Sequence, residues 1–85
     1  GLQIYPNPVS DLTTCSFALA EGSSVRVVIK DAVGREVLEV FEGELPEGNH
    51  EYKISTVRLE SGTFVICLFV DGKEVSSKKV VKTSR

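Results

Sequence analysis

The sequence contains no tryptophan, no methionine and a single histidine, so few of its side chains are suited to catalysis or metal binding. The histidine, His50, has no cysteine or carboxylate partner at the spacing of a metal site. A glycine-rich phosphate loop, a Gly-x-Ser-x-Gly elbow and a pair of acids in an apolar setting are also missing, and nothing marks Ser61 as a nucleophile. We therefore expect a protein that is not an enzyme and that has no catalytic residue, metal or cofactor.

Long apolar runs and a strong net charge are missing as well. No segment approaches the ~20 apolar residues that a transmembrane helix needs. The first six residues lack the basic and apolar regions of a secretory signal, so we expect any export signal to lie upstream. The net charge is −2, and the few aromatic residues do not alternate with a basic patch. This pattern predicts no nucleic-acid partner.

The charges that are present are unevenly distributed along the chain. Residues 36–60 contain seven acidic and two basic side chains, whereas residues 72–85 contain five basic and one acidic. The basic C-terminal segment either keeps strand edges soluble or takes part in binding.

A chain of 85 residues has room for one hydrophobic core, which predicts a single domain over residues 1–85. Valine dominates the apolar residues and favours strands over helices. Segments of strand length, each followed by a turn, occupy residues 2–5, 12–20, 24–30, 35–42, 49–54, 64–70 and 73–82. The pattern predicts an all-β, immunoglobulin-like two-sheet β-sandwich of about seven antiparallel strands. A small closed barrel is the alternative.

Alternation along these segments predicts which side chains face the core. The expected inward residues are Cys15, Phe17, Leu19, Val25, Val27, Ile29, His50, Tyr52 and Ile54. We expect His50 to be structural, with its ring bonded to a neighbouring strand. Residues 64–70 are all apolar, so their strand should be central and covered on both faces. Asp71-Gly72 predicts a tight hairpin turn, and residues 56–59 at most a loop turn.

The two cysteines, Cys15 and Cys67, fall in the predicted second and sixth strands. Immunoglobulin domains link their two sheets by a disulfide at this place. In an exported protein such a bridge is one interpretation, and two buried thiols that act as small apolar side chains are the other.

Six motifs occur in a fixed order along residues 4–82. Pro6-Asn7-Pro8 stands in the first, and the Thr-Thr-Cys-Ser-Phe stretch of residues 13–17 is the second. The others are Asp31-x-x-Gly34-Arg35, Leu45-x-x-Gly48-x-His50, Leu59-x-Ser61-Gly62-Thr63-Phe64 and Lys78-Lys79-Val80-Val81-Lys82. Together they resemble the type A C-terminal sorting domain of the type IX (Por) secretion system of Bacteroidota.

The resemblance implies an immunoglobulin-like domain that acts as the C-terminal secretion signal of a cargo protein. It implies passage through the periplasm and recognition by an outer-membrane translocon and its shuttle protein. In many members a cell-surface sortase then removes the domain and attaches the cargo to the cell surface. The matching recognition residues are Gly62, Phe64, Lys78, Lys79, Val80, Val81 and Lys82. The matching motif and turn residues are Pro6, Asn7, Pro8, Asp31, Gly34, Arg35 and Gly48.

The expected mechanism uses the edge of the last strand, to which a partner adds a strand while the lysines select that partner. Exposed edges also allow a strand-mediated homodimer. Pro6 and Pro8 lack amide donors and should end the first strand, with both preceding peptide bonds trans.

The sequence departs from the family pattern at three places. Phe64 replaces the usual tyrosine, Ser55 stands where an aspartate is common, and residues 83–85 extend past the terminal lysine motif. Two alternative interpretations stay open. Instead of a cleaved secretion signal, the chain would then be a structural immunoglobulin-like module, as in adhesin spacers or flagellar hook-capping proteins, or an uncleaved sorting domain on a component of the secretion machinery.

Overall fold

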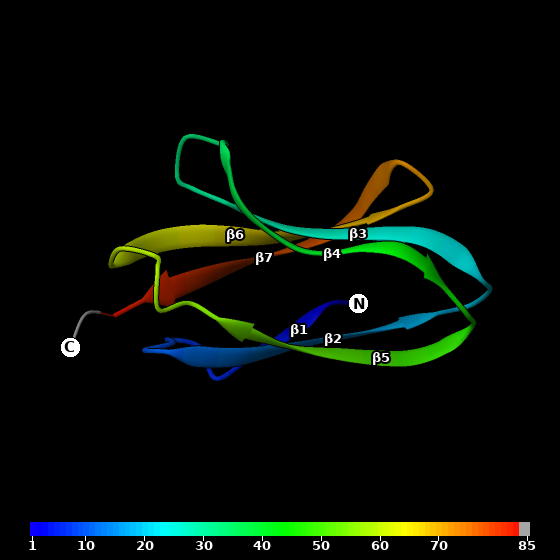
Figure 1. The fold of residues 1–85 in the computed structure, drawn as a ribbon, viewed down its shortest axis with the longest axis horizontal. Coiled ribbons are helices and arrows are strands. Elements are labelled where there is room, and N and C mark those ends of the chain that lie inside the picture. Colours follow the sequence, from blue (N-terminus) through cyan, green and yellow to red (C-terminus); the bar gives the residue numbers. More distant parts are fainter. Residues whose placement is uncertain (84–85) are drawn as a thin grey trace.

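The computed structural model describes residues 1–83 as two antiparallel sheets stacked face to face (Figure 1). The strands are β1 (Gln3–Tyr5), β2 (Leu12–Leu19), β3 (Ser23–Lys30), β4 (Glu36–Leu45), β5 (Gly48–Ser55), β6 (Gly62–Val70) and β7 (Lys73–Lys82). One sheet has the order β1-β2-β5 and the other β4-β3-β6-β7. This arrangement confirms the predicted β-sandwich, and the sheets do not close into a barrel.

The fourth strand joins the sheet that contains the third. In constant-type immunoglobulin domains the fourth strand pairs with the fifth instead. Here β4 pairs with β3, and Arg26 on β3 bonds Glu36 at 2.5 Å and Glu39 at 2.7 Å on β4. One side of the sandwich is therefore flanked by β4 and β5, and the opposite side by β1 and β7.

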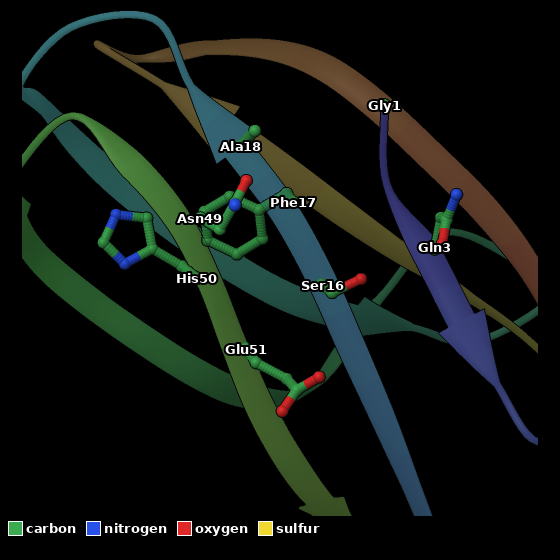
Figure 2. Close-up of a pocket in the computed structure, with 8 residues that line it drawn as sticks. All are labelled: Gly1, Gln3, Ser16, Phe17, Ala18, Asn49, His50 and Glu51. Atoms are coloured by element: carbon green, nitrogen blue, oxygen red, sulfur yellow. The ribbon is translucent and has the colours of Figure 1, made fainter.

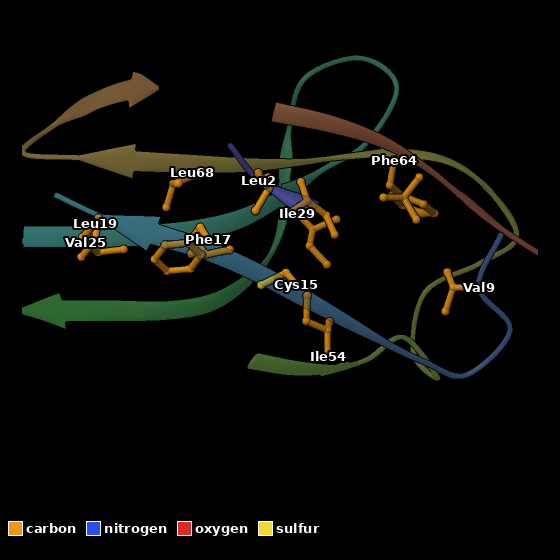
Figure 3. Close-up of a cluster of buried hydrophobic side chains, with 13 residues drawn as sticks. Leu2, Val9, Cys15, Phe17, Leu19, Val25, Ile29, Ile54, Phe64 and Leu68 are labelled. Atoms are coloured by element: carbon orange, nitrogen blue, oxygen red, sulfur yellow. The ribbon is translucent and has the colours of Figure 1, made fainter. Parts of the chain in front are cut away.

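The core lies between the two sheets and follows the predicted alternation (Figure 3). The buried residues that pack together are Leu2, Val9, Cys15, Phe17, Leu19, Val25, Val27, Ile29, Ile54, Phe64, Ile66, Leu68 and Val80. Full burial of each large apolar side chain contributes about 1.5–3 kcal/mol to folding. Val9 lies outside every predicted strand, so alternation alone did not identify it as a core residue.

The prediction for β6 is only partly correct. The strand is central, between β3 and β7, but no further layer covers its outer face within residues 1–83. On that face Cys67 pairs with Val28, and both are buried by neighbouring side chains. The Lys30 ammonium, for example, lies 5.5 Å from the centroid of the Phe69 ring. Long side chains therefore shield this face from solvent, where we had expected a second layer of structure.

The disulfide interpretation is wrong, and the two buried free thiols are confirmed. Cys15 points into the core from β2. Cys67 lies between Ile66 and Leu68, which both point into the core, so its own side chain points to the opposite face of β6. The alternation of a strand thus keeps the two sulfur atoms on different sides of a sheet.

Two local expectations also need correction. His50 and Tyr52 do alternate with exposed neighbours, but they are half-buried and not buried. The Nε2 atom of His50 lies 2.8 Å from the Pro46 carbonyl oxygen, so its bond goes to the preceding turn and not to a neighbouring strand. The peptide bonds before Pro6 and Pro8 are both cis.

The Asp71-Gly72 hairpin turn is confirmed, with φ angles of 51° and 83° at its two central residues. Positive φ at both positions is what a tight turn between β6 and β7 requires. The loop turn at residues 56–59 is also present, closed by a 3.0 Å bond from the Leu59 amide to the Thr56 carbonyl.

The buried thiols make a testable prediction. Burial raises the pKa of the Cys15 thiol to about 11 and also raises the pKa of Cys67. Because the thiolate is the reactive form, folded protein at pH 8 should react with a disulfide reagent about a hundredfold more slowly than urea-unfolded protein. A reductant should leave the unfolding temperature unchanged. Rapid reaction of the folded protein, or a reductant-sensitive unfolding temperature, would contradict this placement.

Candidate functional site

The residues singled out for recognition meet at one end of the sandwich, where β6 begins and β7 ends (Figure 1). Gly62 pairs with Lys82 and Phe64 with Val80 across the two strands. Gly48 lies at the opposite end, where β5 begins after its turn from β4, so it does not belong to this group. Two motifs that are far apart in the sequence therefore form one surface of the protein.

The basic motif on β7 divides into a buried and an exposed set. Val80 is 3% exposed and packs in the core, and Lys82 is 7% exposed. Lys78, Lys79 and Val81 are exposed, and Val81 keeps 37% of its surface. Only the exposed side chains are available to a partner that binds the folded domain.

Lys82 bonds two distant loops with its buried ammonium group. Nζ donates to the Ser10 carbonyl, to the Thr56 carbonyl at 2.8 Å and to the Thr56 hydroxyl at 3.2 Å. The end of β7 is thereby joined to the β1–β2 loop and to the β5–β6 loop. Alternation along β7 could have revealed this role, because Lys82 shares the inward phase of Val80.

The outer edge of β7 is occupied by the Pro6-Asn7-Pro8-Val9 segment. The Asn7 side chain donates from Nδ2 to the Lys79 carbonyl and accepts from the Val81 amide, both at 3.0 Å. Val9 donates to the Val81 carbonyl at 2.9 Å and accepts from the Thr83 amide at 2.8 Å. The expectation that a partner adds a strand along this edge therefore fails for residues 79–83, because its backbone groups already have partners.

The predicted hairpin motif forms a tight turn around one carboxylate. Asp31 Oδ1 accepts from the Val33 amide at 3.1 Å and the Arg35 amide at 2.9 Å, and Oδ2 accepts from Arg35 Nε at 3.0 Å. The Arg35 amide is the main cause of the lowered pKa of Asp31. The hydrogen bonds to the ionised Asp31 carboxylate therefore stabilise the fold at pH values above the unfolded-state pKa of Asp31. This stabilisation is lost as the pH falls through the lowered pKa of the folded state.

A shallow groove lies between this turn and the loop before β6. Its lining residues come from residues 31–37 and 58–64: Asp31, Ala32, Val33, Arg35, Val37, Arg58, Leu59, Glu60, Ser61, Gly62, Thr63 and Phe64. Gly34, with φ of 92°, allows the turn to form beside it. The groove brings the hairpin motif and the start of β6 together.

A second shallow depression lies on the sheet formed by β1, β2 and β5 (Figure 2). The side chains of Gln3, Ser16, Asn49 and Glu51 give it a polar lining, and the Tyr5 hydroxyl donates to Glu51 at 2.7 Å.

Across residues 1–83 no group of three or more metal-ligating side chains occurs. The same residues contain no helix of the length and apolarity that crossing a membrane requires.

Lys82→Met is expected to destabilise the fold, because it removes the charged donor that joins the end of β7 to the Ser10 and Thr56 carbonyls and to the Thr56 hydroxyl. The cost should be about 1–3 kcal/mol in the free energy of unfolding, measured by urea denaturation. Lys79→Met is the matched control on the exposed phase of the same strand and should stay within about 0.5 kcal/mol of the parent. Equal stability of the two variants would contradict the buried role of Lys82.

Asn7→Ala is expected to release the Val81 amide, which loses its side-chain acceptor. Hydrogen exchange measured by NMR should become faster at Val81 by about tenfold, the equivalent of one hydrogen bond. The Thr83 amide, which bonds to the Val9 backbone, is the internal control and should change less. Unchanged exchange at Val81 would show that Asn7 does not cap the strand in solution.

Comparison with known proteins identifies the family of this chain. The family model described as the secretion system C-terminal sorting domain matches residues 3–83, nearly the whole chain. A search of curated proteins found no match. The matched range includes both the Asn7 segment and the last strand that it covers. The chain therefore belongs to the family of type IX secretion C-terminal sorting domains.

Proposed function

We propose that the type IX translocon and its shuttle protein recognise this domain in its folded state, through outward side chains at the joined ends of β6 and β7. The family is that of a C-terminal sorting signal, which directs export to the cell surface or beyond it. The proposal concerns the step within that function at which the signal is recognised.

The observation that carries the proposal is a small exposed surface on β6 and β7. Thr63 pairs with Val81 and Val65 with Lys79, so the four side chains lie together on the outer face of the sheet. We call these four residues the ladder patch. It presents the apolar side chains of Val65 and Val81 beside the Lys79 ammonium group. Such a surface suits a partner that presents an apolar side chain next to a carboxylate.

Contacts with neighbouring residues hold the strands of the ladder patch in place. Phe64 and Val80 anchor the inner face of the same two strands, and Lys82 and Asn7 fix the end of β7. Binding to a preorganised surface costs less ordering entropy than binding to a mobile tail. Among the recognition residues, we assign direct contact to Lys79 and Val81 and positioning to Gly62, Phe64, Val80 and Lys82.

The later steps are proposed from the family. The parent protein would cross the periplasm before it reaches the translocon, and a cell-surface sortase would then remove the domain. In this scheme the domain acts by recognition alone and performs no catalysis. Retention of the domain on a component of the secretion machinery is the alternative outcome, which the mass of the surface-bound parent protein would distinguish.

Lys79→Glu in a full cargo protein is expected to reduce surface display several-fold and to leave cargo in the periplasm. Lys73→Glu is the matched control, since it makes the same charge change at an exposed lysine near the other end of β7. Cell fractionation and immunoblotting measure the two pools. Deletion of residues 78–85 is less informative, because it also removes Val80 and Lys82 from the interior.

Thermal unfolding of the isolated variants separates recognition from stability, and both should unfold within a few degrees of the parent. Equal surface display of the Lys79→Glu and Lys73→Glu cargoes would overturn the proposed role of the ladder patch.

A further inference from the structure

The sandwich has unequal strand edges, and within residues 1–83 β5 has the longest run of edge that no covering segment, proline or register shift interrupts. At the edge of β7, residues 79–83 are covered by Asn7 and Val9. The β1 strand has three residues and runs into two prolines. The β4 strand carries several glutamates and two register shifts against β3, which are features that block edge-to-edge pairing. In contrast, β5 pairs with β2 over eight residues with no register shift.

The backbone of β5 directs every second residue away from β2. The Thr56 amide bonds the Asp11 carbonyl at 2.7 Å, which places the even-numbered residues on the β2 side. The amide and carbonyl groups of Asn49, Glu51, Lys53 and Ser55 therefore point outward. Within residues 1–83, β5 is the end strand of its sheet and pairs with β2 alone.

We propose that β5 is a self-association site, at which a second copy of this chain pairs antiparallel to it about a two-fold axis at Tyr52. In this register Glu51 of each copy lies opposite Lys53 of the other, and Asn49 lies opposite Ser55. The outward groups of each opposed pair can exchange two backbone hydrogen bonds. The interface is isologous, so the assembly closes as a dimer and does not extend into a fibre.

Charge selects this register over its neighbours. A shift of the axis to Glu51 would place that carboxylate opposite its own copy, and a shift to Lys53 would do the same to two ammonium groups. Like charges directly opposite one another in a sheet are destabilising. Among the residues of β5, only the Tyr52-centred register pairs unlike charges and also preserves the outward-facing backbone bonds.

The side chain at the proposed axis also favours a partner. Tyr52 is half-buried on the side of the sandwich that β4 and β5 flank. Its ring stacks on the Phe41 ring, with centroids 4.9 Å apart. Residues at a non-hydrogen-bonded antiparallel position bring their side chains close together. A second copy would therefore cover the exposed part of each Tyr52 ring with its own. This surface lies on the side of the molecule opposite β7, so the inference does not depend on the proposed recognition mechanism.

Charge exchange tests the register directly. Sedimentation velocity of the 85-residue chain at increasing concentration should show a monomer–dimer equilibrium. Glu51→Lys and Lys53→Glu should each weaken the dimer about tenfold, because two attractive pairs become repulsive. The double variant, Glu51→Lys with Lys53→Glu, should restore dimerisation. An equimolar mixture of the two single variants should also form dimers, although neither variant does so alone at that concentration.

Hydrogen exchange gives a second, independent readout. The amides of residues 49, 51, 53 and 55 should become protected as the protein concentration rises, whereas those of residues 50, 52 and 54 should not change. A chain that stays monomeric at millimolar concentration would overturn the proposal. Dimers that the single charge reversals do not weaken would overturn it as well.

Discussion

The placement of the last strand depends on hydrogen bonds from the N-terminal segment, more than seventy residues away in sequence, and from the β5–β6 loop. The Asn7 side chain bonds backbone groups along one edge of β7, as a neighbouring strand would. Val9 continues this pairing with its own backbone groups. From the inner face, Lys82 bonds the two loops at the base of the sandwich. With its edge and inner face both engaged, the end of β7 presents mainly its outer face to a partner. This constraint is the reason why we propose the ladder patch, and not the strand edge, as the recognition surface.

The fold could be predicted from the sequence because strand alternation is a local property. Phe17 and Ile29, for example, lie where a period of two puts them, and Asp71-Gly72 forms the turn that its backbone preferences favour. Alternation also predicts the direction of the Cys67 side chain, because Cys67 lies between two inward residues and therefore faces outward. The disulfide interpretation considered which strands carry the cysteines and neglected the direction of their side chains.

The site was less predictable, because its contacts join distant segments. Nothing local to Asn7 indicates that its side-chain amide pairs with the backbone of β7 and covers that edge. The family motifs also combine two kinds of residue. Asn7, Asp31 and Lys82 hold the backbone in place, whereas Lys79 and Val81 face solvent. A motif read from sequence gives both kinds equal weight, and only the structure separates them.

In-cell photo-crosslinking from single positions of a full cargo is the most direct test of the central claim. A photoreactive residue at position 79 or 81 should form crosslinks with the type IX translocon or its shuttle, and one at position 49 or 53 should form none with either. Both β7 positions point outward from a strand that Asn7 and Lys82 hold in place. Crosslinks to the secretion machinery from positions 49 and 53, with none from positions 79 and 81, would contradict the account.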